Sequence, residues 1–172
     1  LPQIIKGKGI LSVFSDFNYQ QIPFSIEANN LIKTGNIQYE WNNDLGTSFI
    51  GSYSFYNLGS IFFLISLIFP STVFPYLIGP LLILKYVVAA LFAYIFLKRY
   101  VKNKDYAVIG ALLYAFSGFQ ITNMLFNHFH DVVALFPLLL YTLDNYMYDN
   151  IVITDGFSII NEKNLVFKFT NH

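Results

Sequence analysis

The sequence predicts an all-α, polytopic transmembrane protein, and its composition, its apolar runs and its charge distribution support this prediction. The 172 residues are 55% hydrophobic and 12% charged, whereas a soluble domain carries about 25% charged residues. The mean hydropathy of +0.51 agrees with a membrane protein. Lys+Arg and Asp+Glu both number 10, so there is no basic field and no nucleic-acid partner is expected. The absence of cysteine excludes a disulfide framework and a thiol nucleophile.

Residues 1–58 are polar and aromatic with mixed charges, and we expect them to form an extracytoplasmic loop that contains an interfacial helix. Pro23 suits the first turn of this helix and Gly35 suits its end. The apolar residues that share one helical stripe are Phe24, Ala28, Leu31 and Ile32. The polar residues Glu27, Asn29, Asn30 and Lys33 fall largely elsewhere. This pattern is typical of a helix that lies on a membrane surface.

Residues 59–148 form the predicted transmembrane region. Segment 59–70 is apolar but shorter than the roughly 20 residues that a spanning helix needs, so we expect it to lie at the membrane interface. Three spans are expected, near residues 76–97, 106–126 and 132–148. The third contains Pro137 in its first turns, which membrane helices tolerate.

The orientation follows from loop 98–105, which carries four Lys or Arg residues between two predicted spans. Basic loops of this kind face the cytoplasm. Residues 1–58 and 127–131 are then extracytoplasmic, in a multi-pass protein of the cell membrane. If segment 59–70 crossed the membrane, residues 1–58 would instead be cytoplasmic.

Residues 149–172 are a polar tail that we expect to be out of its normal context. Asp155-Gly156 resembles a turn between two short β-like stretches, residues 151–154 and 164–169. The chain begins at Leu1 without a visible signal peptide, and we expect it to be a fragment of a longer protein.

Asp16 is the first candidate for chemistry. It precedes the predicted interfacial helix near the water–lipid boundary, where a carboxylate could act as general base toward a hydroxyl group. Gln20 and Gln21 follow it, and we expect them to contact substrate. The structural alternative is a loop aspartate that caps a turn.

The string His128-Phe129-His130-Asp131 is the second candidate. Two imidazoles and a carboxylate can shuttle protons or hold a metal, although His-x-His spacing is not diagnostic of one. The sequence therefore establishes no cofactor and no metal site, and leaves a divalent cation as a possibility. Alternatively, Asp131 is the N-cap of a helix that begins at Val132.

Lys85 is the third candidate, because a lone charge within a span is costly and suggests a function. If its helix begins near Gly79, Lys85 lies about 9 Å below the outer end. An ammonium group there suits a lipid-linked phosphate. Structural pairing with an acid or with carbonyl groups is the alternative.

The aromatic residues Tyr53, Phe55 and Tyr56 could stack on sugar rings. An aromatic belt at the membrane interface explains them at least as well and is the favoured interpretation.

Several strings, taken in order, resemble the N-terminal part of the bacterial YfhO family over roughly residues 10–148. They are Asp16-Phe17-Asn18-Tyr19-Gln20-Gln21-Ile22-Pro23-Phe24, Trp41-Asn42-x-Asp44-Leu45-Gly46, Leu84-Lys85-Tyr86, Tyr114-Ala115-Phe116-Ser117-Gly118 and His128-Phe129-His130-Asp131 followed by Leu135-Phe136-Pro137-Leu138-Leu139-Leu140.

This resemblance implies a GT-C type glycosyltransferase that takes a sugar from a polyprenyl-phosphate carrier on the outer face of the membrane. The implied acceptors are cell-wall polymers such as lipoteichoic acid, or a glycolipid. Asp16 matches the catalytic acid of the first outer loop, and Asp131 matches an acid of the second. The expected substrate contacts are Gln20, Gln21, Lys85, His128 and His130.

The sequence is therefore interpreted as a fragment of a membrane glycosyltransferase. About three crossings do not build the closed cavity that this chemistry needs, so the fragment alone is expected to be inactive. The alternatives are a lipid or glycolipid transporter or flippase, in which Lys85 gates a lipid phosphate, and an inactive truncated membrane protein.

Overall fold

The structure, a computed structural model, describes residues 4–5, 7–41 and 45–154, with side chains through residue 147. Its elements are η1 (Phe17–Gln21), α2 (Ile22–Thr34), α3 (Phe49–Ser52), η2 (Ser54–Tyr56), α4 (Ile61–Ser66), η3 (Ser71–Val73), α5 (Phe74–Leu97), α6 (Lys104–Ala115), α7 (Gly118–Thr122), η4 (Asn123–Leu125) and α8 (Phe129–Thr154). The described part of the chain contains one isolated β-bridge, between Glu40 and Thr47, and no strand. The all-α prediction is confirmed.

Helix α2 has the predicted ends. Pro23 lies in its first turn, and Gly35 follows it in the left-handed conformation, with a φ of 78°. Its burial differs from the prediction, because Asn29 is fully buried together with Ala28 and Leu31. These apolar residues join a core with Phe17, Phe49, Phe63, Phe74 and Ile78. Helix α2 therefore packs into the protein itself, through a face that includes an amide.

Helix α4 is the only regular helix within the predicted interfacial segment 59–70. Ser60 caps its start by accepting a hydrogen bond from the backbone N–H of Phe63 at 3.1 Å. Its six residues extend about 9 Å, far less than the roughly 30 Å of a bilayer core. The helix is thus too short to cross a membrane, as the sequence predicts.

Helix α5 begins earlier than expected. Its 24 residues start at Phe74, with Pro75 in the first turn and Pro80 inside, and they extend about 36 Å. Lys85 consequently lies about 16 Å from the start of the helix, near its middle. The depth of about 9 Å assumed a helix that begins near Gly79, and this condition is not met, because α5 begins at Phe74.

The second predicted span is not one helix. Helix α6 ends at Ala115, and the backbone of Ser117 is extended, with a ψ of 156°, before α7 begins. Ser and Gly are weaker helix formers than Ala or Leu, and Ser117-Gly118 lies at this break. The span predicted over 106–126 is therefore made of two helical pieces with a break between them. Among the described residues, Ser71–Leu97 and Lys104–Leu125 are nevertheless long and apolar enough to cross a membrane.

Helix α8 begins before Val132, so Asp131 lies in its first turn and is not its N-cap. The helix continues through residues 151–154, where the sequence predicts a β-like stretch. That prediction is wrong because adding a residue to an existing helix is easier than nucleating a new element. The predicted turn at 155–156 and stretch 164–169 lie outside the described residues, as do residues 42–44 of the Trp41–Gly46 string. That α8 forms a third span stays a prediction.

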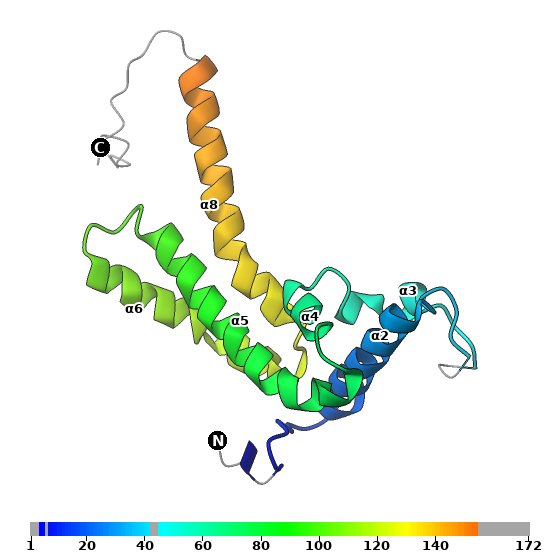
Figure 1. The fold of residues 1–172 in the computed structure, drawn as a ribbon. Helices are drawn as coiled ribbons and strands as arrows, with labels where there is room; N and C mark the ends of the chain where they lie inside the picture. The colour runs from blue at the N-terminus through cyan, green and yellow to red at the C-terminus, as the bar shows by residue number, and fades with distance from the viewer. Residues whose placement is uncertain (1–3, 6, 42–44, 155–172) are drawn as a thin grey trace.

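Helix α5 connects two parts of the fold (Figure 1). Helices α2 and α4 pack near its N-terminal end with α3 beyond them, while α6 runs back beside it and α8 starts next to its middle and then diverges from it. The contact among α5, α6 and α8 is built from small residues: Ala89, Ala115 and Ala134 are each 0% exposed. Small residues let membrane helices approach closely.

The basic loop also contacts α8. Arg99 lies 3.4 Å from the Asp144 carboxylate, and Tyr100 donates a hydrogen bond to the same carboxylate at 2.6 Å. Loop 98–105 therefore ties the α5–α6 hairpin to α8, a role that the sequence did not indicate.

We expect Ala134→Leu to lower the free energy of unfolding by about 1–3 kcal/mol, because the contact among α5, α6 and α8 has no room for a larger side chain. SDS titration of the protein in detergent micelles, followed by circular dichroism, measures this change. Val108→Leu on the exposed face of α6 is the matched control. An Ala134→Leu variant as stable as this control would contradict the close packing.

Candidate functional site

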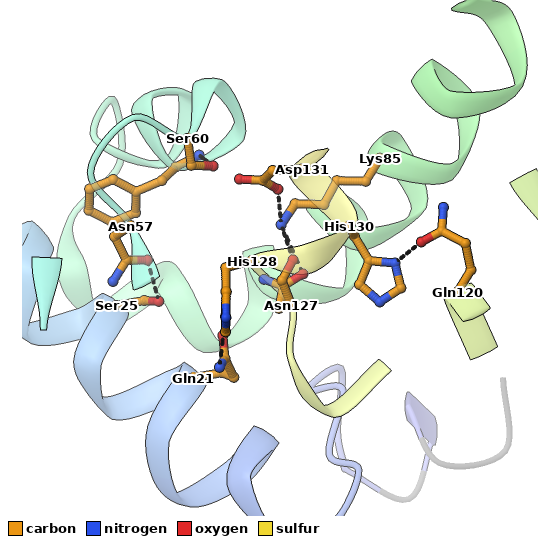
Figure 2. Close-up of polar contacts among 11 residues, drawn as sticks. Gln21, Ser25, Asn57, Ser60, Lys85, Gln120, Asn127, His128, His130 and Asp131 are labelled. Atoms are coloured by element: carbon orange, nitrogen blue, oxygen red, sulfur yellow. Dashed lines mark hydrogen bonds and ion pairs between the residues drawn. The ribbon is translucent and has the colours of Figure 1, made fainter. Parts of the chain in front are cut away.

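The two strings that the sequence singles out lie side by side in the structure (Figure 2). The side-chain nitrogen of Gln21 is 3.5 Å from Nδ1 of His128, although the residues are 107 positions apart. Elements η1 and η4 are in contact, which brings the Asp16 string and the His128–Asp131 string together. This proximity places four of the predicted site residues around one junction: Asp16, Gln20, Gln21 and His128.

The Asp16 string forms a π-helical turn, η1, immediately before α2. π-Turns are rare and often occur at functional sites. Phe17 is fully buried and anchors the turn in the core, while Gln21 is buried toward His128. Asp16 is only partly buried. Its carboxylate accepts long hydrogen bonds from Ser15 at 3.4 Å and Gln20 at 3.5 Å.

Tyr56 links the Asp16 string to His128. Its hydroxyl donates to Oε1 of Gln20 at 2.7 Å, which leaves the Gln20 amide nitrogen directed at Asp16. Its ring meets the His128 imidazole edge to face, with 5.1 Å between centroids. Burial, and then the negative charge of Asp16, raise the pKa of Tyr56, so it remains a hydrogen-bond donor.

Tyr53 and Tyr56 also pack against Phe24, with centroid distances of 4.1 and 5.4 Å. These rings therefore build an aromatic cluster beneath His128. Sequence reasoning identified the aromatic group but not the position of Tyr56, because nothing in the spacing indicates its contact with Gln20.

Lys85 is 3% exposed, and three oxygen atoms surround its ammonium group. Asp131 forms an ion pair with it at 2.5 Å. Asn127 accepts from it twice, at 2.8 Å through the backbone carbonyl and at 2.9 Å through the side chain. Two of the three N–H donors of the ammonium group thus bind Asn127, and the Asp131 carboxylate balances its charge. The pairing with an acid and a carbonyl, one of the two alternatives for Lys85, is therefore present, and its contact with a lipid-linked phosphate stays a prediction.

Asn127 was missed by sequence reasoning. It lies directly before the His128–Asp131 string and supplies two of the three oxygens at Lys85. Its position next to that string is the only sequence signal that could have identified it.

The two histidines point in different directions (Figure 2). His130 faces Gln120, with its Nδ1 in hydrogen-bond contact with Oε1 of that residue, and it is 1% exposed. Burial, and then the charge of Lys85, lower the pKa of His130 to about 4. The same two causes lower the pKa of His128. Both imidazoles are therefore neutral near pH 7, and it is His128 that faces the Asp16 string.

A small pocket lies beside Lys85, between α5 and the N-terminal elements. Its polar lining consists of Ser25, Tyr56, Asn57, Ser60, Lys85 and Asn127, and its apolar lining of Phe62, Phe63, Phe74 and Leu81. Ser25 donates to Oδ1 of Asn57 at 2.9 Å. The Asn57 amide nitrogen is buried and has no hydrogen-bond partner among the described residues. The pocket thus combines a cation with a spare N–H donor.

The divalent-cation possibility gains no support from the side-chain arrangement. Within residues 4–5, 7–41 and 45–147, no three His, Asp or Glu side chains come together as metal ligands. His128 and His130 diverge, and Asp131 is occupied by Lys85.

Comparison with known families accounts for most of the chain. Residues 3–154 match the family described as bacterial membrane protein YfhO. The chain belongs to the YfhO family. The resemblance of its motifs and the membrane prediction are both confirmed by this match, since the family is one of membrane proteins. No curated protein and no solved structure matches the chain.

We expect Lys85→Met to lower the free energy of unfolding by about 3–5 kcal/mol, because it leaves the Asp131 carboxylate without its counter-ion in a water-poor site. SDS titration in detergent micelles measures the change. Lys98→Met, an exposed lysine of the basic loop, is the matched control.

Removing both charges tests whether the unpaired Asp131 carboxylate causes the loss of stability in Lys85→Met. The double variant Lys85→Met with Asp131→Leu should recover most of the lost stability, because an apolar pair can replace a buried ion pair. A double variant less stable than Lys85→Met alone would contradict this account of the site.

Acidification should destabilise the fold through His130. Its pKa is about 4 in the folded protein and 6.5 in the reference state, so between these values the unfolded chain binds the proton and the folded chain does not. The contribution of neutral His130 to the free energy of unfolding is therefore fully present above pH 6.5 and is lost as the pH drops toward 4. The expected loss through His130 is about 2 kcal/mol between pH 7 and pH 5.

Thermal unfolding in detergent at several pH values measures this loss. His130→Gln removes the titrating group and should show a flatter pH dependence than the unchanged protein. An identical pH dependence in both proteins would contradict a neutral, buried His130.

Proposed function

We propose that this chain is part of a bacterial membrane glycosyltransferase of the GT-C type. The enzyme would transfer a sugar from a polyprenyl-phosphate donor to a cell-wall polymer such as lipoteichoic acid, or to a glycolipid, on the outer face of the membrane. The observation that carries the proposal is the convergence of Asp16, His128 and the Lys85 cluster from distant parts of a YfhO-family membrane protein.

The proposed reaction is a direct displacement at the anomeric carbon of the sugar. The acceptor hydroxyl oxygen forms a bond to this carbon, the bond to the phosphate oxygen breaks, and the hydroxyl proton passes to a carboxylate. Asp16 and Asp131 are the two candidates for this base. Asp16 is the better one, because it is partly exposed and makes only two long hydrogen bonds. Asp131 is held by Lys85 at 2.5 Å.

Gln20 and Tyr56 support Asp16 in this role. Tyr56 fixes the Gln20 amide with a 2.7 Å hydrogen bond, and Gln20 in turn holds one carboxylate oxygen. The Asp16 carboxylate is thereby oriented without being fully occupied. A base needs this combination, since it must keep a lone pair free for the proton.

Lys85 and its pocket would bind the phosphate of the carrier lipid. The ammonium group offsets the charge that develops on the departing phosphate, as donors do in an oxyanion hole. The unpartnered amide of Asn57 supplies a further N–H in the same pocket. Because Asp131 and Asn127 already surround Lys85, phosphate binding requires one of these oxygens to move aside.

Gln21, His128 and His130 would act on the acceptor side. Gln21 and His128 line the junction next to Asp16 and could orient the acceptor hydroxyl. His130 is buried against Gln120, so it would act by holding the start of α8. The proposal requires residues 1–58 and 127–131 to be extracytoplasmic and loop 98–105 to be cytoplasmic.

Asp16→Asn in the complete protein should reduce sugar transfer by at least about 100-fold, because the amide cannot accept the acceptor proton. Transfer of radiolabelled sugar to wall polymer, in membranes of cells expressing the protein, measures the effect. Asp105→Asn on the exposed first turn of α6 is the matched control and should retain activity. Full activity of the Asp16→Asn variant would remove Asp16 from the mechanism.

The pair Asp16→Asn and Lys85→Ala distinguishes the transporter alternative from the transferase. A lipid transporter breaks no bond, so its lipid movement would stop in Lys85→Ala and continue in Asp16→Asn. Fluorescent-lipid flipping in proteoliposomes reports this directly, and such a pattern would favour the transporter over the transferase.

A further inference from the structure

Helix α4 has two apolar faces that meet different surroundings. Phe62, Phe63 and Ser66 are buried against the protein. On the other side, Ile61 is 53% exposed, Leu64 57% and Ile68, just beyond the helix, 78%. A short helix in a water-soluble protein places polar residues on its outer face, and α4 does not.

The absence of charge extends well beyond α4. Residues 45–84 contain no Asp, Glu, Lys, Arg or His, a stretch that includes α3, α4 and the first half of α5. A surface in contact with water normally carries charged side chains throughout. This stretch also continues directly through Pro70 into Ser71–Leu97, which is apolar enough to span a membrane.

The backbone carbonyl groups at and just beyond the end of α4 accept hydrogen bonds from the protein, so they do not depend on water. Asn29 of α2 donates to the carbonyl of Ser66 at 3.2 Å and to that of Phe69 at 3.5 Å, and Lys33 also donates to the Phe69 carbonyl. The last carbonyls of a helix have no partner within it. In hydrocarbon they must be satisfied by the protein. Here the backbone N–H groups of Leu67, Ile68 and Phe69 reach the carbonyls of Leu64, Ile65 and Ser66, and Asn29 of α2 adds a second donor at Ser66.

The buried face of α4 borders the Lys85 cluster. The Phe62 ring lies 5.5 Å from the Lys85 ammonium, and Phe62 and Phe63 line the adjoining pocket. Helix α4 therefore stands between this polar site and whatever covers its exposed face.

We propose that the exposed face of α4, formed by Ile61, Leu64, Ile65 and Ile68, is inserted among the acyl chains of the bilayer. Helix α4 is then a non-spanning helix that is partly inserted in the membrane. It separates the lipid from the Lys85 cluster. The absence of charge in residues 45–84, the carbonyl groups satisfied by the following backbone and by α2, and the continuity with the α5 span favour hydrocarbon over another protein surface. This inference is independent of the proposed glycosyl transfer.

Single cysteines provide a direct test, because the sequence contains none. The variants Leu64→Cys and Ile68→Cys, labelled with the fluorophore NBD, are reconstituted in phosphatidylcholine nanodiscs with and without nitroxide-labelled phosphatidylcholine. Leu91→Cys on the exposed side of α5 is the membrane control, and Asn36→Cys, exposed beyond α2, is the aqueous control.

Quenching at positions 64 and 68 by nitroxide lipid should match that at position 91 and exceed that at position 36 several-fold. Iodide in solution should quench position 36 but neither position 64 nor position 68. Quenching of both α4 positions by iodide would overturn the proposal, because the face would then meet water. Protection from both quenchers would also overturn it, because protein would then cover the face. If Leu64→Cys disturbs folding, Ile68→Cys, outside the helix, carries the test alone.

Discussion

The buried ammonium group of Lys85 is the constraint on which the arrangement of this protein depends. A charge transferred from water to a nonpolar environment costs several kcal/mol unless opposite charge and hydrogen bonds compensate for it. Here the compensation comes from Asp131 and from two oxygens of Asn127. Because these partners lie at and just before the start of α8, the ion pair fixes that start against the middle of α5. The position of α8 relative to the hairpin follows from this contact and from the close approach at Ala89, Ala115 and Ala134.

The broken second apolar segment makes this arrangement possible. A continuous helix from α6 would run past the middle of α5 toward its N-terminal end. The extended backbone at Ser117 instead redirects the chain, so that Gln120 is buried against His130 and η4 reaches η1. The break therefore brings residues 127–131 next to the Asp16 string, where Gln21 and Tyr56 complete the junction.

Helix α5 thus has two environments along one continuous element. Its first half packs against α2 and α4, and its second half against α6 and α8, with the polar cluster at the boundary. Sites of this kind, polar side chains enclosed by apolar helices, are uncommon and usually functional in membrane proteins. Membership of the YfhO family places the cluster in a membrane protein. The proposed transfer chemistry gives Asp16 the partly exposed, reactive position and Lys85 the enclosed, charge-balancing one.

The sequence by itself determined the fold class, the family, the ends of α2 and the brevity of the helix at 61–66. The family depends on the order of short motifs, and the other features depend on composition, on Pro and Gly at helix ends and on the length of apolar runs, all of which can be read along the chain without its contacts. The sequence also identified Asp16, His128 and Asp131 as residues of interest. Only the tertiary structure decided that Lys85 pairs with Asp131 and Asn127, and that Tyr56 binds Gln20 beside Asp16. It also decided that His130 faces Gln120 and not the Asp16 string, and that the helical segment over 106–126 is interrupted. These outcomes depend on contacts between residues far apart in the chain, where burial and charge pairing outweigh the propensities of each segment.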